Sequence, residues 1–421
     1  MTTVSGYLQF AGLDAPIELR VDQRFVDALP VVFPKWAHKI TATAPAASFA
    51  SIVWDGQSYL LESPFMDKPK RYPEPVNTLV SAIVELAWAR LRGDTSLLCL
   101  HGAAVEFAGR LVVFPSTRRA GKSTLTVALA AADKRVFTDD FLPLKITEGE
   151  QLHGVSSGIS PRLRLPLPEQ IGPDAEKYVG RRSSISNSQY RFVAPISDEL
   201  ASFGDTAPIG SLVFLERSDG ATAALEPMNH ADALTALIKQ NFSRAMNAGG
   251  ILKMLDFISS SAPAYRLIYD EAEPAIAVLN AHFNSWADPV PAFPADLSDS
   301  IYHTALDTEQ ATQTIDVHQG SFLQASGITE AASDGKRFLT GRNGQSIHYL
   351  NDGAATIWHL LDEPTSVAEA IEMLCAVFPD HPADQIRQDV VNTFTEFSRN
   401  GLLQIAEPVC QTPEIEAVLP V

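Results

Sequence analysis

Apolar and polar residues alternate along the first sixty positions, with the period of two that is typical of a half-buried strand. Four segments have this pattern: residues 7–10, 17–21, 51–54 and 58–61. Asp55 and Gly56 stand between the last two, and an Asp-Gly pair there favours a β-hairpin with a type I′ turn. Residues 68–75 are charged and contain prolines, as expected of a linker. The pattern predicts a β-rich N-terminal module over residues 1–75.

From residue 76 onward, runs with helical spacing alternate with short apolar runs. The predicted helices cover residues 76–92, 125–129, 229–240, 251–259 and 273–283. The predicted strands cover residues 97–100, 111–114, 136–140, 209–216 and 264–269. This alternation favours an α/β core over residues 76–283. Residues 151–207 have neither period and are predicted to be irregular, with the serine-rich segment 177–191 as a mobile loop that acts as a lid or contacts a peptide.

The pattern changes again after residue 283. Residues 284–314 contain prolines and a polar run, which indicates a linker. Residues 315–406 predict a hairpin around Asn343 and Gly344, a helix capped by Asn351, and two further helices. The predicted boundaries are strands at 337–339, 346–350 and 402–405, and helices at 353–361, 367–378 and 384–400. A hairpin with three helices is winged-helix-like, and residues 407–421 are predicted to be a tail.

Charge and cysteine content narrow the function classes. Lys and Arg number 32 against 50 Asp and Glu, a net charge of −18. This sign disfavours nucleic acid and anionic membrane surfaces as general partners. The third helix of the winged-helix-like domain carries Asp384, Asp389 and Glu396 rather than a basic face, which argues against DNA recognition. The three cysteines lack metal-ligand spacing, and neither a secretion signal nor a membrane-spanning run is found. We therefore expect a cytoplasmic protein.

The strongest chemical motif follows the predicted strand at 111–114. A Gly-Lys-Ser sequence between a strand and a helix is the context of a phosphate-binding P-loop, although the motif position that is usually glycine holds Ser116. In such a loop Lys122 reaches the β and γ phosphates of ATP, and the Ser123 hydroxyl binds Mg²⁺. A chance tripeptide in an ordinary turn is the alternative. The predicted nucleotide-binding residues are Ser116, Thr117, Arg118, Arg119, Ala120, Gly121, Lys122, Ser123 and Thr124.

An acidic pair follows the P-loop helix. Asp139 and Asp140 end the predicted strand at 136–140, where carboxylates suit Mg²⁺ binding and a base near a γ-phosphate. Asp-Asp is also common in solvated turns. His101 ends another predicted strand, and a lone histidine is more often structural than catalytic. Arg162 and Arg164 would point the same way in a strand and could neutralise phosphate charge, or they are simply solvated.

Over roughly residues 95–283 these motifs resemble the HPr kinase/phosphorylase family and its relatives with a PEP-carboxykinase-like nucleotide fold. The resemblance is carried by His101 with Gly102, by the loop at 116–124, and by Asp139 with Asp140. It implies ATP and Mg²⁺ as cofactors, one aspartate as base on an acceptor hydroxyl, and the other aspartate as a metal ligand beside Ser123. It implies that the histidine supports the pair. Which aspartate is the base stays open, as does a homo-oligomeric state.

The C-terminal region resembles the PqqD family of precursor-peptide recognition elements. The resemblance is carried by residues 346–360, which contain the sequence LNDGAATIWHL, and by residues 367–374 and 401–403. It implies that a leader peptide adds as a strand to the hairpin edge and lies against the third helix. Trp358 is expected in the core. The implied peptide-binding residues are Ile347, His348, Tyr349, Arg387, Val391 and Thr395.

Together the two resemblances predict an ATP-dependent kinase that phosphorylates a Ser or Thr of a ribosomally synthesised precursor peptide. The C-terminal domain would hold the leader, and the linker would raise the effective concentration of the acceptor residue. Further maturation enzymes stay open as partners. One alternative is an ATP-binding adaptor that presents a peptide to another enzyme, and a second is a small-metabolite kinase with a regulatory C-terminal domain.

Overall fold

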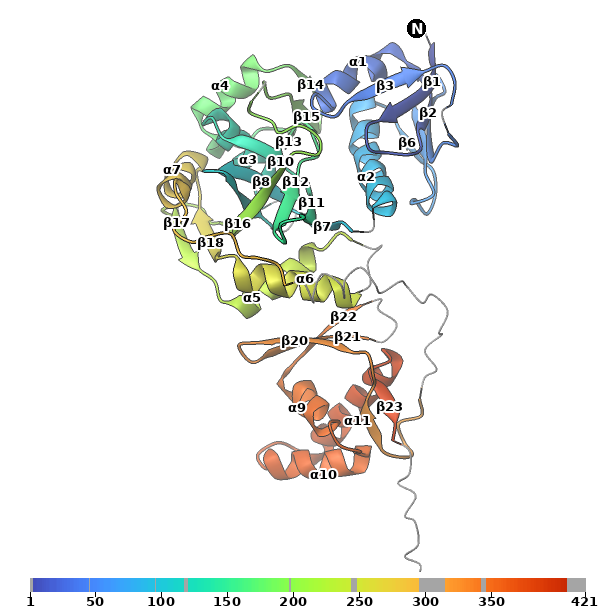
Figure 1. The fold of residues 1–421 in the computed structure, drawn as a ribbon, viewed down its shortest axis with the longest axis vertical. Helices are drawn as coiled ribbons and strands as arrows, with labels where there is room; N and C mark the ends of the chain where they lie inside the picture. The colour runs from blue at the N-terminus through green and yellow to red at the C-terminus, as the bar shows by residue number, and fades with distance from the viewer. Residues whose placement is uncertain are drawn as a thin grey trace, which may run out of the picture. The chain divides into compact units, whose positions relative to one another are not determined.

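The computed structural model describes residues 3–44, 46–94, 96–116, 120–196, 198–243, 248–294, 315–341 and 346–406 (Figure 1). They fall into two compact units, residues 1–304 and 305–421. The mixed α/β class expected from the sequence is confirmed. Among the described helices, none combines the length and apolar character needed to cross a bilayer. The expected turn at Asn343 and Gly344, the tail at 407–421 and most of the expected linker lie outside the described residues.

The first 75 residues build a six-stranded sheet with the order β3-β1-β2-β4-β5-β6. The predicted hairpin forms, but Trp54 pairs with Tyr59, so the connection has four residues rather than a two-residue type I′ turn. The Asp55 carboxylate accepts hydrogen bonds from the backbone N–H groups at 57 and 58, which closes the longer loop. The strands are β1 (Thr3–Phe10), β2 (Ile17–Asp22), β3 (His38–Thr41), β4 (Ala50–Trp54), β5 (Tyr59–Glu62) and β6 (Lys70–Tyr72).

Three elements of this module, β3, α1 and β6, were missed in the sequence. Helix α1 (Gln23–Val32) buries Phe25, Leu29 and Val32, which recur at helical spacing, and Asp22 caps its first turn. Strand β6 lies inside the expected linker and pairs with β5. The charges of Lys70 and Arg71 are therefore on an edge strand, where charged residues are common.

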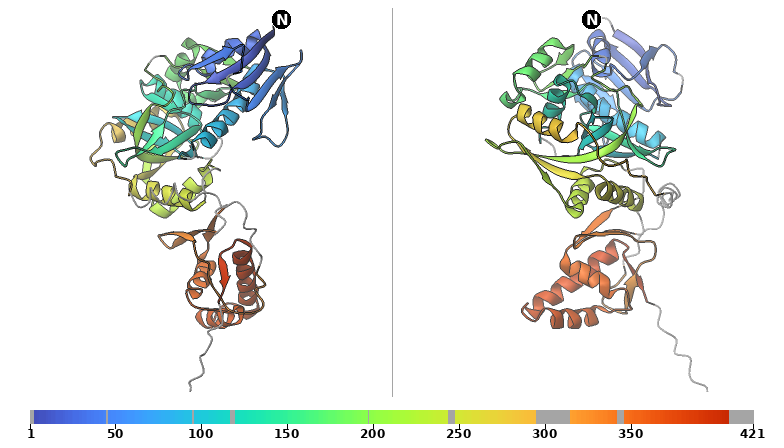
Figure 2. Two further views of the ribbon diagram at one scale, coloured as in Figure 1. Left: turned by 45° about the vertical axis from the view of Figure 1, so that its right-hand side comes forward. Right: turned by 60° about the vertical axis from the view of Figure 1, so that its left-hand side comes forward.

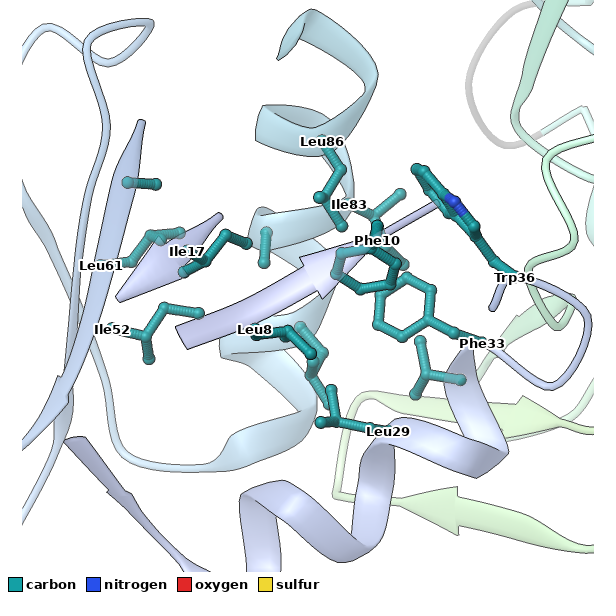
Figure 3. Close-up of a cluster of buried hydrophobic side chains, with 14 of the residues drawn as sticks. Leu8, Phe10, Ile17, Leu29, Phe33, Trp36, Ile52, Leu61, Ile83 and Leu86 are labelled. Atoms are coloured by element: carbon teal, nitrogen blue, oxygen red, sulfur yellow. The ribbon is translucent and has the colours of Figure 1, made fainter. Parts of the chain in front are cut away.

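One hydrophobic cluster joins the N-terminal sheet to the rest of its unit. Helix α2 (Pro75–Gly93), predicted correctly, packs Ile83 and Leu86 against residues of β1, β2 and α1, as Figure 3 shows. Cys99 and Phe141, from strands of the α/β core, belong to the same cluster. The β-rich module and the core therefore share one apolar interior.

The α/β core is built on a nine-stranded sheet with the main order β10-β8-β9-β16-β12-β11-β7. β16 pairs in parallel with both β9 and β18, so the carboxyl ends of these three strands meet at one edge of the sheet. The strands are β7 (Leu98–His101), β8 (Ala103–Phe107), β9 (Arg110–Phe114), β10 (Arg135–Thr138), β11 (Phe141–Ile146), β12 (Leu152–Val155), β16 (Thr206–Arg217), β17 (Ala224–Pro227) and β18 (Ala264–Tyr269).

Helices cover this sheet in two groups (Figures 1 and 2). α3 packs against α4 and α7, and α5 packs against α6. The bounds of α3, α5, α6 and α7 agree with the predicted helices to within a few residues, because their apolar stripes are continuous. The helices are α3 (Lys122–Ala131), α4 (Pro173–Arg181), α5 (His230–Gln240), α6 (Ala248–Ser261) and α7 (Ala272–Phe283).

The prediction that residues 151–207 are irregular is wrong. Besides β12 and α4, they form a short 3-10 turn and a small sheet with the order β13-β15-β14. The supposed mobile loop at 177–191 lies on α4, β14 and β15. These strands are three or four residues long, too short to show alternation, and distant pairing together with the burial of Leu163 and Phe192 holds them. The elements are β13 (Arg162–Arg164), η1 (Glu169–Ile171), β14 (Ser184–Ser186) and β15 (Tyr190–Val193).

The first part of the expected linker packs on the core. Trp286 donates from its indole nitrogen to the Phe107 carbonyl at 2.8 Å. Phe293 is fully buried and contacts the Phe257 ring edge-on. Apolar side chains inside a proline-containing stretch explain why residues 285–294 belong to the core.

The C-terminal unit has its own hydrophobic core, which includes Trp358 as predicted. Its helices are bounded by the predicted signals: Asn351 caps α9, and Gly401 follows α11 with φ of 67°. Strands β19 and β20 were not predicted. The elements are β19 (Phe322–Gln324), β20 (Thr329–Ser333), β21 (Lys336–Thr340), β22 (Ile347–Leu350), α9 (Asp352–Leu360), α10 (Val367–Val377), α11 (Ala383–Arg399) and β23 (Leu403–Ile405). They form a β20-β21-β22 sheet and a β19-β23 pair.

Replacing Asp22 with alanine should destabilise the N-terminal sheet strongly. Its buried carboxylate accepts from the Phe25 N–H, the Arg24 guanidinium and the Tyr59 hydroxyl, the last at 2.7 Å. Loss of a helix cap together with a buried hydroxyl left without its partner should lower the free energy of unfolding by about 3 kcal/mol. Urea unfolding followed by circular dichroism measures this. Asp27→Ala, an exposed change on the same helix, should cost less than about 0.5 kcal/mol, and equal losses in both variants would contradict the assignment.

Candidate active site

The predicted P-loop lies between β9 and α3, at the carboxyl edge of the parallel strands. Gly121 precedes the helix with φ of 92°, and a Cβ there would stand 2.6 Å from the Tyr269 hydroxyl. Only glycine fits both constraints without strain. Ser116 is buried, and its hydroxyl accepts from the Leu215 N–H at 2.9 Å, which ties the start of the loop to β16. The serine that replaces the motif glycine therefore has a structural partner. Residues 117–119, three of the predicted nucleotide contacts, lie outside the described residues.

Lys122 begins α3 and is 8% exposed. Its ammonium donates to the Ser116 carbonyl at 2.5 Å, across the loop. The N–H groups in the first turn of a helix have no partner within the helix, so the start of α3 offers donors and a partial positive charge to an anion. The loop start, the lysine and the helix start thus surround one position suited to phosphate.

The acidic pair lies in the turn between β10 and β11. The Thr138 hydroxyl accepts from the N–H groups of Asp140 and Phe141, each at 3.3 Å, and this shapes the turn. Asp139 is 6% exposed and accepts from the Arg162 N–H at 3.0 Å. The nearby Ser123 hydroxyl favours the ionised form of Asp139, so the acidic pair lies beside the start of the P-loop helix.

Asp140 has two cationic or polar partners. His101 Nε2 lies 3.1 Å from one carboxylate oxygen, and the Arg162 guanidinium lies 3.2 Å from the other. Because a carboxylate only accepts, the histidine proton belongs on Nε2. Nδ1 of the same ring lies 3.1 Å from the Gln240 side-chain amide. With the proton on Nε2, Nδ1 accepts, so the amide donates from its NH2 group, and the two contacts fix the ring plane. His101 thereby connects the last residue of α5 to the acidic pair.

The environment separates the pKa values of the two aspartates. Burial, followed by the neighbouring Asp140 charge, raises the pKa of Asp139 to about 6. Burial acts on Asp140 too, but the His101 hydrogen bond and the positive charges of Arg162 and Lys122 outweigh it, and the pKa of Asp140 is held below its ordinary value. Two adjacent carboxylates with opposite shifts are an arrangement typical of catalytic sites.

The two arginines predicted to share a face do so. The guanidinium groups of Arg162 and Arg164 lie 5.2 and 5.8 Å from the Tyr190 ring centre. Arg162 alone reaches the acidic pair, while Arg164 is exposed. Of the sequence alternatives, the site role therefore fits Arg162 and the solvated role fits Arg164.

The predicted metal ligands come together as a hydroxyl and two carboxylates: Ser123, Asp139 and Asp140. Within the described ranges no cluster of three or more His, Cys, Asp and Glu side chains is suited to a metal ion. An oxygen-only set with few carboxylates is what Mg²⁺ uses when it also binds substrate phosphates. The residues present therefore fit Mg²⁺ with a nucleotide, and they do not fit a structural zinc site.

Sequence reasoning missed three residues of this site. Gln240 orients His101 from a helix about 140 positions away, and no sequence signal marks it. Thr138 shapes the turn but resembles any strand residue. Tyr269 ends β18, and its pKa is raised to about 12 by burial beside the P-loop. The sequence signal for Tyr269 was its position at the end of a predicted strand, since the ends of parallel strands meet at one edge of the sheet.

The predicted peptide groove of the C-terminal unit involves β22 and α11. β22 pairs only with β21 among the described strands, so its other edge has no strand partner there. Tyr349 is 54% exposed, whereas Ile347 and His348 are half-buried. Burial lowers the pKa of His348, opposed by the charge of Glu396, which places the α11 carboxylate near β22. Arg387, Val391 and Thr395 recur every fourth residue on α11 and so share one face.

Comparisons with known proteins give a family match for the C-terminal region. Residues 339–403 match the family model of the coenzyme PQQ synthesis protein D (PqqD), which confirms the C-terminal resemblance predicted from the sequence. Among solved structures, the "Structure of the Hpr(Ser) kinase/phosphatase from Coxiella burnetii" is similar at 14% identity, with 44% of this chain and 95% of that chain covered and a TM-score of 0.23. A likeness at that score carries no argument about activity. No curated protein matches the chain.

Removing the Asp139 charge should stabilise the metal-free protein in a pH-dependent way. The folded pKa is raised from 3.8 to about 6, so the folded state binds the proton more tightly than the unfolded chain. The free energy of unfolding therefore falls as pH rises through this window and stays reduced above it. Asp139→Asn should gain on the order of 2 kcal/mol at pH 8, with the gain disappearing toward pH 4. Thermal unfolding in EDTA measures this. The exposed Asp198→Asn is the control, and a gain independent of pH would contradict a buried charge.

Proposed function

We propose that this chain is an ATP-dependent kinase that phosphorylates a Ser or Thr of a ribosomally made precursor peptide, whose leader the C-terminal unit binds. The observation that carries the proposal is the position of the Asp139–Asp140 pair beside the start of the P-loop helix. Asp140 contacts His101 and Arg162, and the charge of Lys122, the first residue of that helix, also acts on it. The second support is the PqqD family match over residues 339–403.

The P-loop side of the site would bind the nucleotide. Lys122 would exchange the Ser116 carbonyl for β and γ phosphate oxygens, with the N–H groups of the α3 start as further donors. Ser123 and Asp139 would hold Mg²⁺, which when bound supplies positive charge to the phosphates. A partly protonated Asp139 would ionise fully on metal binding, because a nearby cation favours the carboxylate.

Asp140 is the aspartate that we assign as base. Transfer forms a bond between the acceptor oxygen and the γ-phosphorus, breaks the bond from that phosphorus to the leaving oxygen of ADP, and passes the hydroxyl proton to Asp140. A low pKa is compatible with this role, because phosphoryl transfer depends mainly on positioning and charge stabilisation. His101, fixed by Gln240, keeps one oxygen of Asp140 occupied so that the other faces Arg162 and the acceptor.

Arg162 has two functions in this mechanism. Its backbone N–H fixes Asp139, and its guanidinium contacts Asp140 while half-exposed. The same group is placed to stabilise negative charge on the transferred phosphoryl group. A guanidinium that leaves Asp140 for the phosphoryl oxygens would also free that carboxylate for the acceptor hydroxyl.

The C-terminal unit would supply specificity. An added leader strand would pair with the outer edge of β22, with main-chain bonds giving affinity and the α11 face giving selectivity. Tethering the leader to the same chain as the active site raises the local concentration of the acceptor. A truncated substrate without its leader should therefore be phosphorylated more slowly at low concentration.

Phosphate transfer should depend on Lys122 and Asp140. Full-length protein, Mg-ATP and a precursor peptide encoded beside the gene should give a peptide that gains one phosphate by intact-mass spectrometry. Lys122→Ala and Asp140→Asn should each slow this by at least about 100-fold, because each removes a charge that acts on the transferred group. Lys177→Ala, an exposed lysine, should leave the rate unchanged. Binding of ATP and peptide without transfer would favour the adaptor alternative.

Peptide capture should depend on the exposed face of α11. Val391→Asp places a charge between Arg387 and Thr395 and should weaken leader binding at least about tenfold, because an apolar contact is replaced by a charge that must lose water. Fluorescence anisotropy with a labelled leader measures the affinity. Asn392→Asp adds the same charge at the next, exposed position and should bind normally. Equal binding by both variants would place the leader elsewhere. Deletion of residues 315–421 should weaken peptide phosphorylation sharply, whereas phosphorylation of a small metabolite that survives this deletion would favour the metabolite-kinase alternative.

A further inference from the structure

A cavity of about 410 Å³ lies beside α2, where the N-terminal sheet meets the α/β core. Its walls come from the β1–β2 turn, from the end of α2, and from β11 and β12. The apolar lining includes Phe49, Phe65, Leu97 and Phe203. None of the described P-loop residues and neither aspartate of the acidic pair lines it, so it is separate from the candidate active site.

Arg90 contributes a positive charge to the lining of this cavity. Its guanidinium lies 4.5 Å from the Phe203 ring centre, and Phe203 in turn stacks on Trp36 at 4.6 Å. Burial lowers the pKa of Arg90, yet an arginine stays charged in proteins. Throughout the described ranges, its guanidinium makes no hydrogen bond or ion pair with a protein acceptor.

Many other arginines of this unit are paired with carboxylates. In its described part, seven of them form ion pairs within 4 Å: Arg24, Arg71, Arg135, Arg162, Arg182, Arg217 and Arg266. The chain carries 50 acidic against 32 basic residues, so carboxylates are plentiful. Arg90 is partly shielded from water and makes no ion pair within 4 Å with a described carboxylate, and the Asp94 carboxylate acts on it only at longer range. An exogenous anion in the cavity would therefore stabilise this guanidinium.

The other charged residues of the cavity limit the net charge of the anion that it can bind. Lys145 is half-buried on the wall, whereas Asp14 and Asp94 line it as exposed residues. The charges of Arg90 and Lys145 balance those of Asp14 and Asp94, so the cavity has no net charge. The two cations are more buried than the two carboxylates. This balance suits a single negative charge placed deep in the cavity better than a phosphate with two. Arginine binds a carboxylate with two parallel hydrogen bonds.

We infer that this cavity binds a small aromatic carboxylate. The carboxylate would pair with Arg90 and Lys145, and the ring would pack on Phe49, Phe65 and Leu97. The ligand could be a free aromatic acid or the terminal carboxylate of a peptide that ends in an aromatic residue, since both present the same chemistry. The inference does not depend on the kinase proposal, and its test reads binding alone.

The test is isothermal titration of the full-length protein with N-acetylphenylalanine and with its amide, which lacks the charge. The acid should bind with a Kd of roughly a millimolar, as expected of a ligand of this size, and the amide at least about tenfold more weakly. Arg90→Gln should weaken binding of the acid at least about tenfold, and Lys145→Gln by about threefold. Arg20→Gln, an exposed arginine on β2, should bind like the parent.

Two further ligands distinguish a free acid from a peptide terminus, and a second variant keeps the test valid if Arg90→Gln does not fold. Benzoate, and the tripeptide Gly-Gly-Phe with a free carboxyl end, distinguish a free acid from a peptide terminus, and binding of either supports the site. If Arg90→Gln unfolds, Lys145→Gln carries the test, because its side chain is only half-buried. Equal binding of acid and amide, binding unaffected by either substitution, or no binding of any probe would overturn the inference.

Discussion

The candidate active site depends on two adjacent carboxylates, of which Asp139 is buried and Asp140 is partly exposed. Asp139 and Asp140 would repel each other and lose hydration if they stood alone, and their surroundings resolve the conflict unequally. One aspartate keeps a raised pKa and lies near Ser123 at the start of the P-loop helix. The other is held as an anion by His101, Arg162 and Lys122. The roles that we propose, Asp139 as metal ligand and Asp140 as base, rest on this asymmetry.

The same constraint explains why distant segments converge on one turn. β7 delivers His101, β13 delivers Arg162, and α5 delivers Gln240, each from a different part of the chain. Pairing of β7 with β11 sets His101 opposite Phe141, the residue directly after the acidic pair. The small β13-β15-β14 sheet also supports the acidic pair, because it holds the backbone of Arg162, whose N–H donates to Asp139. The fold around the site is thus largely a support for buried negative charge.

Sequence patterns predicted the long helices and the P-loop because those signals are local. The apolar stripe of α2 and the Gly-Lys-Ser motif after β9 are visible within twenty residues of chain. The order of residues 151–207 was missed because strands of three or four residues show no period. Gln240 and Tyr269 were missed because their roles exist only after distant strands pair. Asp139 and Asp140 were identified as a pair, but the opposite direction of their pKa shifts follows from burial, which a sequence does not display.

The shared cluster beneath α2 has a consequence for how such chains can be recombined. Residues of the N-terminal sheet complete the same interior as Cys99 and Phe141, whereas the C-terminal unit closes its own core around Trp358 and Phe394. A cut near residue 75 would expose an apolar face next to the acidic pair. A cut between the two units would expose none of the clustered core. The natural point of exchange in this architecture is therefore the connection before residue 315, where a different recognition unit could be grafted without disturbing the fold that holds the aspartates.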